Sequence, residues 1–500
     1  MLKHDYTNRV STNNIEPKEY NVFFGRVREL EIMEKMYKKH GFELLVLYGR
    51  RRIGKTTLIS HFIQNKQAIF FSAQEANDVI NLKMFSQLIY KFSGLEKSGL
   101  PAFTDWNSAF LYLADKIRNK RLVLVIDEFP YAAGANKGLK SILQNVIDHK
   151  LRNTNIFIIL SGSHIGFMEN EVLGSKSPLF GRRTAQMKLS GFDYIDAADM
   201  LSKFSNEDKI KLYSCIGGTP YYLSRIDKRL SFEKNLETLF FEPSGYLYEE
   251  PLMLLKQELR EGAVYNSIIS AIALGATKLN DISLKTGEER SKTIKYLDTL
   301  IGLNILYKEF PFGENPEKSR KGIYRINDNC YRFWYRYVFM NKTSIEQGTG
   351  AALLKFYLPE LNSYIGGPFE DICMQYMIRM NNLLELPFIF SQSGRWWRPD
   401  SEIDMVFSDA SRKKIIFAEC KWRNELKDTA ALKKLIEKSK LFNNVSYLAA
   451  RENTYYYMFS KTPFSKSCES LANQTGNIKL ICLKDLFFTS QGKNNQNLYS

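Results

Sequence analysis

Paired cysteines are missing from this sequence. Only six of its 500 residues are cysteines, and no two of them form a CxxC pair. Scattered cysteines are typical of proteins in a reducing compartment, where disulfides are rare. The sequence therefore indicates neither a disulfide framework nor a zinc site.

Long apolar runs are missing too. No stretch approaches the ~18 apolar residues of a membrane-spanning helix, and the start, "MLKHDYTNRVSTNN", contains no apolar signal core. No cationic amphipathic anchor stands out either. We therefore expect a cytoplasmic protein without a membrane partner.

Acidic residues are in deficit, with 54 Asp and Glu against 70 Lys and Arg and a net charge of +16. This balance favours a polyanionic partner, nucleic acid before membrane, and DNA is the first expectation. A solvated basic surface would give the same count. The content of 44% hydrophobic and 13% aromatic residues is that of a folded protein, and the length predicts three or four domains.

The order of expected elements predicts a multi-domain α/β protein. Apolar runs of strand length first alternate with helical stretches, which predicts a parallel sheet with helices on both faces. A helical stretch follows, and then three helices and two strands around a charged loop, which is the winged-helix pattern. After a linker-like segment, "NKTSIEQGTG", come a helix from Gly367, two strands, another helix and a late strand, "VSYLAA". The expected domains are a core built on the parallel sheet (1–190), a helical domain (191–255), a winged helix (256–340) and a C-terminal α/β domain (350–490).

A phosphate-binding loop is the strongest motif. "GRRRIGKTT" matches G-x-x-x-x-G-K-[ST] and lies between an expected strand and an expected helix. Glycines let successive N–H groups turn toward phosphates, the lysine reaches the β and γ oxygens, and the threonine hydroxyl holds Mg²⁺. The expected nucleotide-binding residues are Gly49, Arg50, Arg51, Arg52, Ile53, Gly54, Lys55, Thr56 and Thr57.

A second motif supports ATP hydrolysis. The apolar strand "LVLVIDEF" ends in Asp127 and Glu128. Asp127 would hold the Mg²⁺ together with Thr56, and Glu128 would polarise the attacking water. Two acids at the end of a strand are weak support alone, but they become strong support downstream of a phosphate loop.

Six segments resemble, in order, the archaeal-type AAA+/STAND ATPase family: "FFGRVRELEIM", the phosphate loop, "VLVIDEF", "ILSGSHIGFME", "SPLFGRRT" and "IGGTPYYL". The resemblance implies an adenine pocket, a γ-phosphate sensor, an arginine finger and a lid contact. The residues it implies for these roles are Phe24, Gly25 and Arg26 (adenine), Ser161 or Ser163 (sensor), Arg182 or Arg183 (finger), and Gly218 and Pro220 (lid). The two arginines could also be surface charges, and the glycines at 217–218 an ordinary helix cap.

A charged strand end lies near the C-terminus. Alternation in "IIFAECKW" places Glu419 and Lys421 on one face, and the preceding strand "SEIDMVF" carries Asp404. This pattern resembles the D…(D/E)-x-K core of the restriction-endonuclease-like superfamily, and the nuclease-like domain often fused to archaeal-type ATPases. The resemblance implies that Asp404 and Glu419 bind metal, that Lys421 orients or deprotonates the attacking water with a pKa lowered by burial and the metal, and that Glu370 is a weaker helper. A degenerate binding module or a plain charged strand end would show the same residues.

Two basic or aromatic features point toward DNA. The third helix of the expected winged helix, "ERSKTIKYLDTL", places Arg290, Lys292 and Lys295 on exposed turns, although this domain could instead pack internally. Trp396 and Trp397 in "RWWRPD" could stack on bases or lie in the core.

The function that these patterns predict is Mg²⁺-dependent ATP binding and hydrolysis coupled to DNA binding, with nuclease activity and the oligomeric state left open. A nucleotide-controlled signalling switch with an inactive nuclease-like module is the alternative, and an origin-loader-like AAA+ protein is a further one. Salt-dependent DNA binding would separate a DNA-binding protein from a switch.

Overall fold

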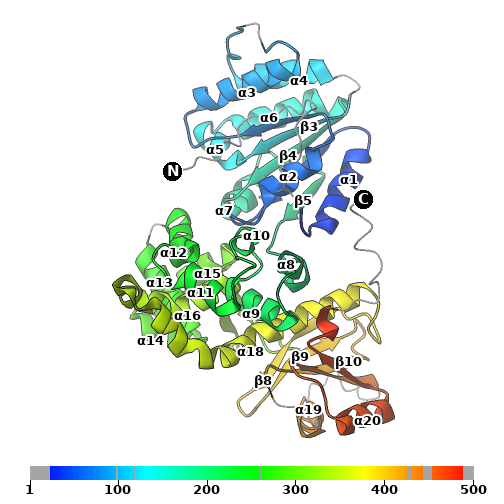
Figure 1. The fold of residues 1–500 in the computed structure, drawn as a ribbon. Coiled ribbons are helices and arrows are strands. Elements are labelled where there is room, and N and C mark those ends of the chain that lie inside the picture. The colour runs from blue at the N-terminus through cyan, green and yellow to red at the C-terminus, as the bar shows by residue number, and fades with distance from the viewer. Residues whose placement is uncertain are drawn as a thin grey trace. The chain divides into compact units, whose positions relative to one another are not determined.

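The computed structural model describes residues 23–96, 99–117, 120–259, 261–424, 429–442 and 453–487. The chain divides into two compact units, Met1–Gly191 and Phe192–Ser500 (Figure 1). The predicted strand "VSYLAA" lies outside the described residues.

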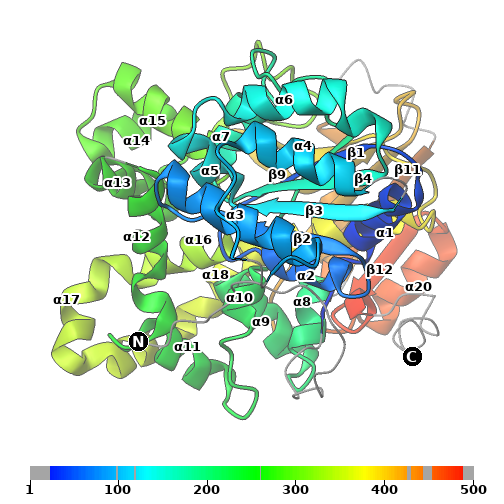
Figure 2. The ribbon, with the colours of Figure 1, turned by 90° about the horizontal axis from the view of Figure 1, so that it is seen from above.

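The first unit is built on a five-stranded sheet whose neighbouring strands are all parallel (Figure 2). The strand order is β2-β3-β4-β1-β5, which confirms the predicted parallel sheet. β1, β3 and β4 are buried along their whole length because helices cover both faces, as continuous apolar runs require. The strands are β1 (Glu43–Tyr48), β2 (Ala68–Ser72), β3 (Leu122–Asp127), β4 (Ile156–Gly162) and β5 (Ala185–Lys188).

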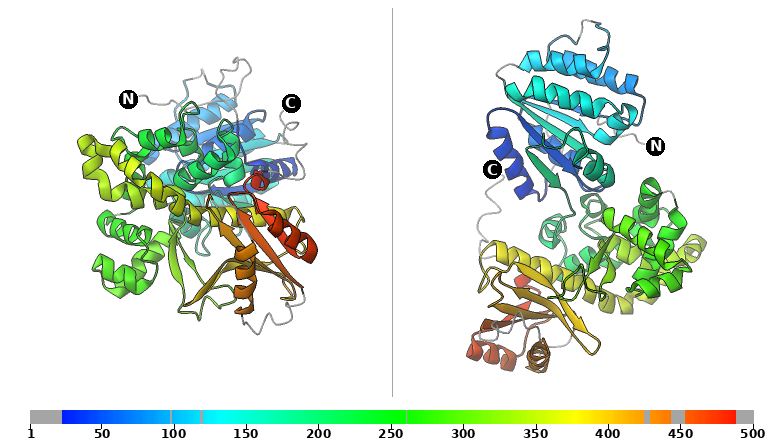
Figure 3. Two further views of the ribbon diagram at one scale, coloured as in Figure 1. Left: turned by 60° about the horizontal axis from the view of Figure 1, so that its bottom comes forward. Right: turned by 180° about the vertical axis from the view of Figure 1, so that it is seen from behind.

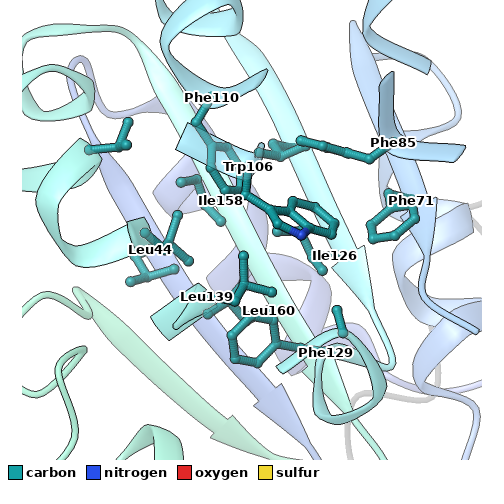
Figure 4. Packing of buried hydrophobic residues seen from close by; sticks show 14 of the residues in the cluster. Leu44, Phe71, Phe85, Trp106, Phe110, Ile126, Phe129, Leu139, Ile158 and Leu160 are labelled. Atoms are coloured by element: carbon teal, nitrogen blue, oxygen red, sulfur yellow. The ribbon is translucent and has the colours of Figure 1, made fainter. Parts of the chain in front are cut away.

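Helices cover the two faces unequally. One face packs on α1 (Val27–Lys38) and α2 (Lys55–Ile63). The other packs on a larger set whose aromatic centre is Trp106, with Phe71, Phe85 and Phe110 around it (Figure 4). That set comprises α3 (Asp78–Phe92), α4 (Trp106–Ile117), α5 (Phe129–Ala135) and α6 (Leu139–His149), and the connections after β4 include α7 (Ile165–Phe167).

The second unit begins with helices and a β-ribbon. The helices after residue 191 are α8 (Tyr194–Met200), α9 (Asn206–Ile216), α10 (Pro220–Leu223), α11 (Phe232–Phe240) and α12 (Tyr246–Glu258). The three helices and two antiparallel strands expected of a winged helix follow in the predicted order. They are α13 (Gly262–Ala273), α14 (Leu279–Thr286), α15 (Arg290–Gly302), β6 (Leu306–Glu309) and β7 (Ile323–Ile326).

The segment with linker composition is helical. After α16 (Asn329–Tyr337) the chain forms short helical turns through α17 (Lys342–Ser344) and runs into the 33-residue α18 (Gly350–Asn382). The expected helix start at Gly367 was therefore wrong. Buried Ile345 and Leu354 hold these turns against the unit, and Gly348 leaves helical geometry, with φ 86°.

The C-terminal sheet has the order β12-β11-β10-β9-β8, antiparallel from β8 to β10 and parallel from β10 to β12. α18 packs on β9 and β10, whereas α19 (Thr429–Lys440) packs on β9, β10 and β11 (Figure 3). The strands are β8 (Gln392–Arg398), β9 (Ser401–Ser408), β10 (Ile415–Lys421), β11 (Thr454–Ser460) and β12 (Ile478–Cys482), with α20 (Lys466–Thr475) before the last.

Candidate nucleotide site and C-terminal carboxylate site

The phosphate loop joins β1 to α2 and is folded tightly onto its own lysine. The Lys55 ammonium donates to the carbonyl oxygens of Gly49 at 2.9 Å and Arg50 at 3.1 Å, and the side chain is only 6% exposed. Gly54 adopts φ 88°, which a residue with a Cβ rarely adopts. A Cβ on Gly49 would lie 2.4 Å from the Leu189 carbonyl oxygen. The loop therefore requires glycine at both positions, and Lys55 can exchange its carbonyl partners for phosphate oxygens.

The residues expected to hold Mg²⁺ meet in the structure. The Thr56 hydroxyl donates to Asp127 Oδ2 at 2.9 Å. Asp127 is buried at the end of β3, and within the described residues its Oδ1 has no hydrogen-bond partner. A buried carboxylate oxygen without a partner is costly. The donor set of a hydroxyl and a free carboxylate oxygen fits a hard cation such as Mg²⁺.

Glu128 is held by Ser163, one of the two residues predicted as the sensor. Its backbone is left-handed, with φ 51° and ψ 44°, as the cap of α5. Its Oε2 accepts from the Ser163 hydroxyl at 2.8 Å and from the Ser163 N–H at 3.1 Å. Ser161 is fully buried on β4, and its hydroxyl has no hydrogen-bond partner in the described part of the chain. Of the two sensor candidates, Ser163 is the one that contacts the predicted catalytic carboxylate.

One of the residues expected near adenine, Arg26, contacts the phosphate loop. Arg26 is buried, and its guanidinium donates to the carbonyls of Ile53 at 3.0 Å and Ser190 at 2.6 Å. Phe23, one residue before the expected set, stacks on His61 of α2 with ring centroids 4.1 Å apart. Gly218 and Pro220 belong to the second unit. The adenine and lid roles of these residues stay predictions.

The two arginine-finger candidates differ in their surroundings. Arg182 donates to Asp148 at 2.9 Å, and this hydrogen bond holds the pKa of the Asp148 carboxyl below its ordinary value. The Arg183 guanidinium lies 5.7 Å from the centre of the Phe180 ring. A finger role for Arg182 would require it to leave Asp148, so the choice between the two arginines stays open.

One contact of the phosphate loop was not predicted. Arg51 donates to the Tyr131 hydroxyl at 2.9 Å, which ties the loop to the helix that follows Glu128. The sequence shows that Tyr131 lies less than one helical turn after Glu128, and therefore near the nucleotide site. It does not show that Arg51 is the partner of Tyr131.

The predicted carboxylates converge in the C-terminal sheet. The antiparallel ladder between β9 and β10 ends at the pair Met405–Ala418, and Asp404 and Glu419 are the next residues on the two strands. The Glu419 carboxylate lies close enough to Asp404 to act electrostatically on it. Asp404 is fixed there because its Oδ2 accepts from the Cys420 N–H at 2.8 Å.

Two ammonium groups face Glu419. Lys421 donates to Glu419 Oε1 at 2.6 Å, as the alternation predicted. Lys438 of α19 donates to Oε1 at 2.8 Å and to Oε2 at 3.1 Å. Sequence reasoning missed Lys438 because it lies on a different element, in the basic run "KKLIEKSK".

The pKa values of Asp404 and Lys421 are both raised above their ordinary values. Burial, and after it the Glu419 carboxylate, raise the pKa of Asp404 to about 6. Burial lowers the pKa of Lys421, but Glu419 and Asp404 outweigh burial and raise it above its ordinary value. The expected lowering of the Lys421 pKa by burial and a bound metal stays a prediction. A more basic ammonium is suited to orienting a water and poorly suited to deprotonating it.

The remaining predicted members lie at the edge of this site. Glu370 of α18 forms an ion pair with Arg395 of β8, and Arg395 in turn acts electrostatically on the Asp404 carboxyl. Trp396 and Trp397 are half-buried, and Trp396 packs edge-on against Phe442. Trp396 thus has at least one core contact.

The donor chemistry of the C-terminal site is that of a two-carboxylate site. Over the described ranges, no group of three or more His, Cys, Asp or Glu is arranged to hold a metal ion. Mg²⁺ keeps several waters and binds proteins through one or two carboxylates. Asp404 and Glu419 fit such an ion once one of the two lysines leaves Glu419.

The α15 helix exposes a basic surface. Thr293, Leu297 and Leu300 are buried against the domain. Three basic residues of this helix are exposed, and we name them the α15 basic set: Arg290, Lys292 and Lys295.

In the described part of the chain, no helix is both long and apolar enough to cross a membrane.

Comparisons with known proteins match two separate parts of the chain to known families. Residues 23–226 match a family described as an ATPase domain predominantly from Archaea, and residues 334–434 match archaeal and bacterial proteins of unknown function. The uncharacterized protein MJECL04 of Methanocaldococcus jannaschii is 34% identical over 452 residues, covering 89% of this chain and 97% of that protein.

Two solved structures are similar over the larger part of the chain. The Walker-type ATPase PABY2304 of Pyrococcus abyssi has a TM-score of 0.48 at 19% identity, covering 63% of this chain and 96% of that one. The ORC2 protein of Aeropyrum pernix, in ADPNP-ADP complexes, has a TM-score of 0.40 at 13% identity, covering 65% and 95%.

Proposed function

Since the chain belongs to the family of protein MJECL04 of Methanocaldococcus jannaschii and contains an archaeal-type P-loop ATPase domain, we propose that it hydrolyses ATP with Mg²⁺ and couples this reaction to DNA binding. The observation that carries the proposal is the pairing of Thr56 with Asp127, whose second oxygen has no partner in the described part of the chain, beside Glu128. The alternative is a nucleotide-controlled switch without a nucleic-acid partner.

The site residues have distinct tasks. Lys55 exchanges the Gly49 and Arg50 carbonyls for phosphate oxygens, so loop opening accompanies binding. Thr56 and Asp127 would hold a Mg²⁺ ion, and this ion would supply positive charge to the β and γ phosphates. Ser163 positions the Glu128 carboxylate, which orients the attacking water. If the γ-phosphate took the Ser163 hydroxyl as a donor, Glu128 would lose this hydrogen bond and could change position. The bound nucleotide would then control the position of the catalytic carboxylate.

ATP binding and turnover test this part. Lys55→Ala should abolish ATP binding, and Glu128→Gln should retain binding while turnover falls ~10²–10⁴-fold. Lys137→Ala, an exposed lysine of the same unit, is the control and should change neither. Unchanged turnover in Glu128→Gln would remove this carboxylate from the mechanism.

The α15 basic set is the proposed DNA-binding surface. Three exposed cations on one helix can bind phosphates, and removing one such cation reduces the salt slope of binding by about one. Replacing the set with alanine should weaken binding to duplex DNA and flatten its salt dependence. Equal binding of wild type and variant across salt concentrations would place DNA elsewhere, and the absence of binding would favour the switch.

A second candidate activity, metal-dependent cleavage of phosphodiesters, is favoured by the C-terminal carboxylates. Asp404 and Glu419 lie on neighbouring strands, and after burial the Glu419 charge contributes to the raised pKa of Asp404. A divalent ion there would stabilise charge on the scissile phosphate. In this proposal Asp404 and Glu419 hold the ion, Lys421 orients the water, and Glu370 acts through Arg395. Asp404→Ala should eliminate cleavage of DNA and leave ATP hydrolysis intact.

A further inference from the structure

Lys438 occupies a special position on Glu419. Lys421 reaches Oε1, whereas Lys438 spans Oε1 and Oε2 at 2.8 and 3.1 Å. A lysine that bridges both oxygens lies along the edge by which a carboxylate binds a cation. The Lys438 side chain is 15% exposed and that of Lys421 is 31% exposed, so Lys438 is the more enclosed of the two ammonium groups.

The pair with Lys438 is not needed to hold α19 in place. The helix is fixed to the sheet by Leu432 and Leu435, both fully buried. Glu419 keeps a second ammonium partner in Lys421 when Lys438 leaves. A lysine has a flexible four-carbon stem, so its ammonium can move away from Glu419 without a movement of the helix.

We propose that Lys438 is a tethered counter-cation that occupies the metal-binding edge of Glu419, exchanges with a divalent cation, and after the exchange contacts a phosphate of bound nucleic acid. The inference rests on the proposed phosphodiester cleavage and adds a positioning residue to it. Metal and nucleic acid then bind cooperatively, because the ammonium displaced by the metal gains a phosphate partner. A lysine with a purely structural role predicts neither effect.

Metal binding is the first test. Mn²⁺ is titrated by electron paramagnetic resonance into the full chain without nucleotide, with Asp127→Asn in every sample to remove the ATPase metal site. Lys438→Met should tighten the Mn²⁺ binding that depends on Asp404 by about tenfold, since a positive charge leaves the site. Lys438→Arg should retain weak binding. Lys434→Met, an exposed lysine on the same helix, is the matched control and should leave affinity unchanged.

Oligonucleotide binding is the second test. In Ca²⁺, a single-stranded oligonucleotide should bind Lys438→Met more weakly than wild type, with a salt slope smaller by about one. A rise in metal affinity together with a fall in nucleic-acid affinity is the expected signature. If Lys438→Met does not fold by circular dichroism, Lys438→Gln replaces it in both tests with the same expectations.

The outcomes separate the inference from the function beneath it. Equal Mn²⁺ affinity of wild type and the neutral Lys438 variants, with binding still abolished in Asp404→Asn, would overturn the role of Lys438 alone. Tighter metal binding with an unchanged oligonucleotide slope would overturn the phosphate contact. If no Mn²⁺ binding depends on Asp404 in any variant, both the inference and the proposed cleavage activity fail.

Discussion

Replacing Asp404 by asparagine should stabilise the C-terminal sheet when no metal is present. Burial and the neighbouring Glu419 raise the pKa of Asp404 to about 6, from an ordinary value of 3.8. A carboxyl whose pKa rises on folding contributes stability in full below pH ~4, and this contribution is lost as the pH rises through about 6. At neutral pH the fold therefore holds an ionised Asp404 at a free-energy cost.

The size of this cost follows from the two pKa values. A rise from 3.8 to about 6 corresponds to about 3 kcal/mol at pH 8, as an upper value. Asparagine has the same shape and keeps an oxygen that can accept from the Cys420 N–H, which in the wild type donates to Asp404 at 2.8 Å. Asp404→Asn should therefore gain up to about 3 kcal/mol at pH 8 and nothing at pH 4.

Local hydrogen exchange is the suitable assay, because two units need not unfold together. Exchange of the β9 and β10 amides is followed by mass spectrometry in EDTA at pH 8, with calorimetric melting at pH 4 and pH 8 beside it. Asp409→Asn is the control, because it should change the stability of the sheet in the opposite direction. Although burial opposes it, hydrogen bonds from Ser411 and Lys414 lower the pKa of Asp409, so its loss should destabilise the same sheet at neutral pH. If Asp404→Asn were less stable than wild type at pH 8 without metal, Asp404 would be a structural partner.

Three further predictions concern single residues of the two sites. Gly49→Ala places a Cβ 2.4 Å from the Leu189 carbonyl oxygen and should lower both the melting temperature of the first unit and its ATP affinity; Gly134→Ala, with open space around it, should change neither. Lys421→Ala should lose DNA cleavage while Mn²⁺ binding persists, and a loss of both would make Lys421 structural. One of Arg182→Ala and Arg183→Ala should lose about 10³-fold in ATP turnover, and mixing that variant with Glu128→Gln should restore part of the activity if the arginine acts on a neighbouring copy.

The parts of the fold that could be predicted are those in which one local pattern decides the structure. The continuous apolar runs of β1, β3 and β4 require cover on both faces, and the phosphate loop requires a strand before it and a helix after it. The alternation in β10 likewise placed Glu419 and Lys421 on one face. These predictions needed no knowledge of tertiary contacts.

The errors came where tertiary burial overrode local composition. The expected helix began at Gly367, whereas α18 begins at Gly350 and contains Pro359, Pro368 and a Gly366–Gly367 pair in its interior. Buried Leu361 and Phe369 hold the helix against the rest of the unit despite those residues. Lys438 shows the same limit at the site, because no periodicity connects a helical lysine to a strand glutamate. Its role depends on where α19 packs.

Carboxylates in this chain differ in whether the fold provides partners for their oxygens and their charge. Asp371 pairs with Arg332 at 3.0 Å, and a pair of that kind is complete within the fold. Asp127 instead has a buried oxygen without a hydrogen-bond partner in the described residues, which costs free energy. The raised pKa of Asp404 means that the fold disfavours its ionised form. A cation that binds either carboxylate removes its cost, so Mg²⁺ with ATP should stabilise the first unit and a divalent ion alone the C-terminal sheet. Because each carboxylate lies in its own unit, the two stabilisations should be separable by Asp127→Asn and Asp404→Asn.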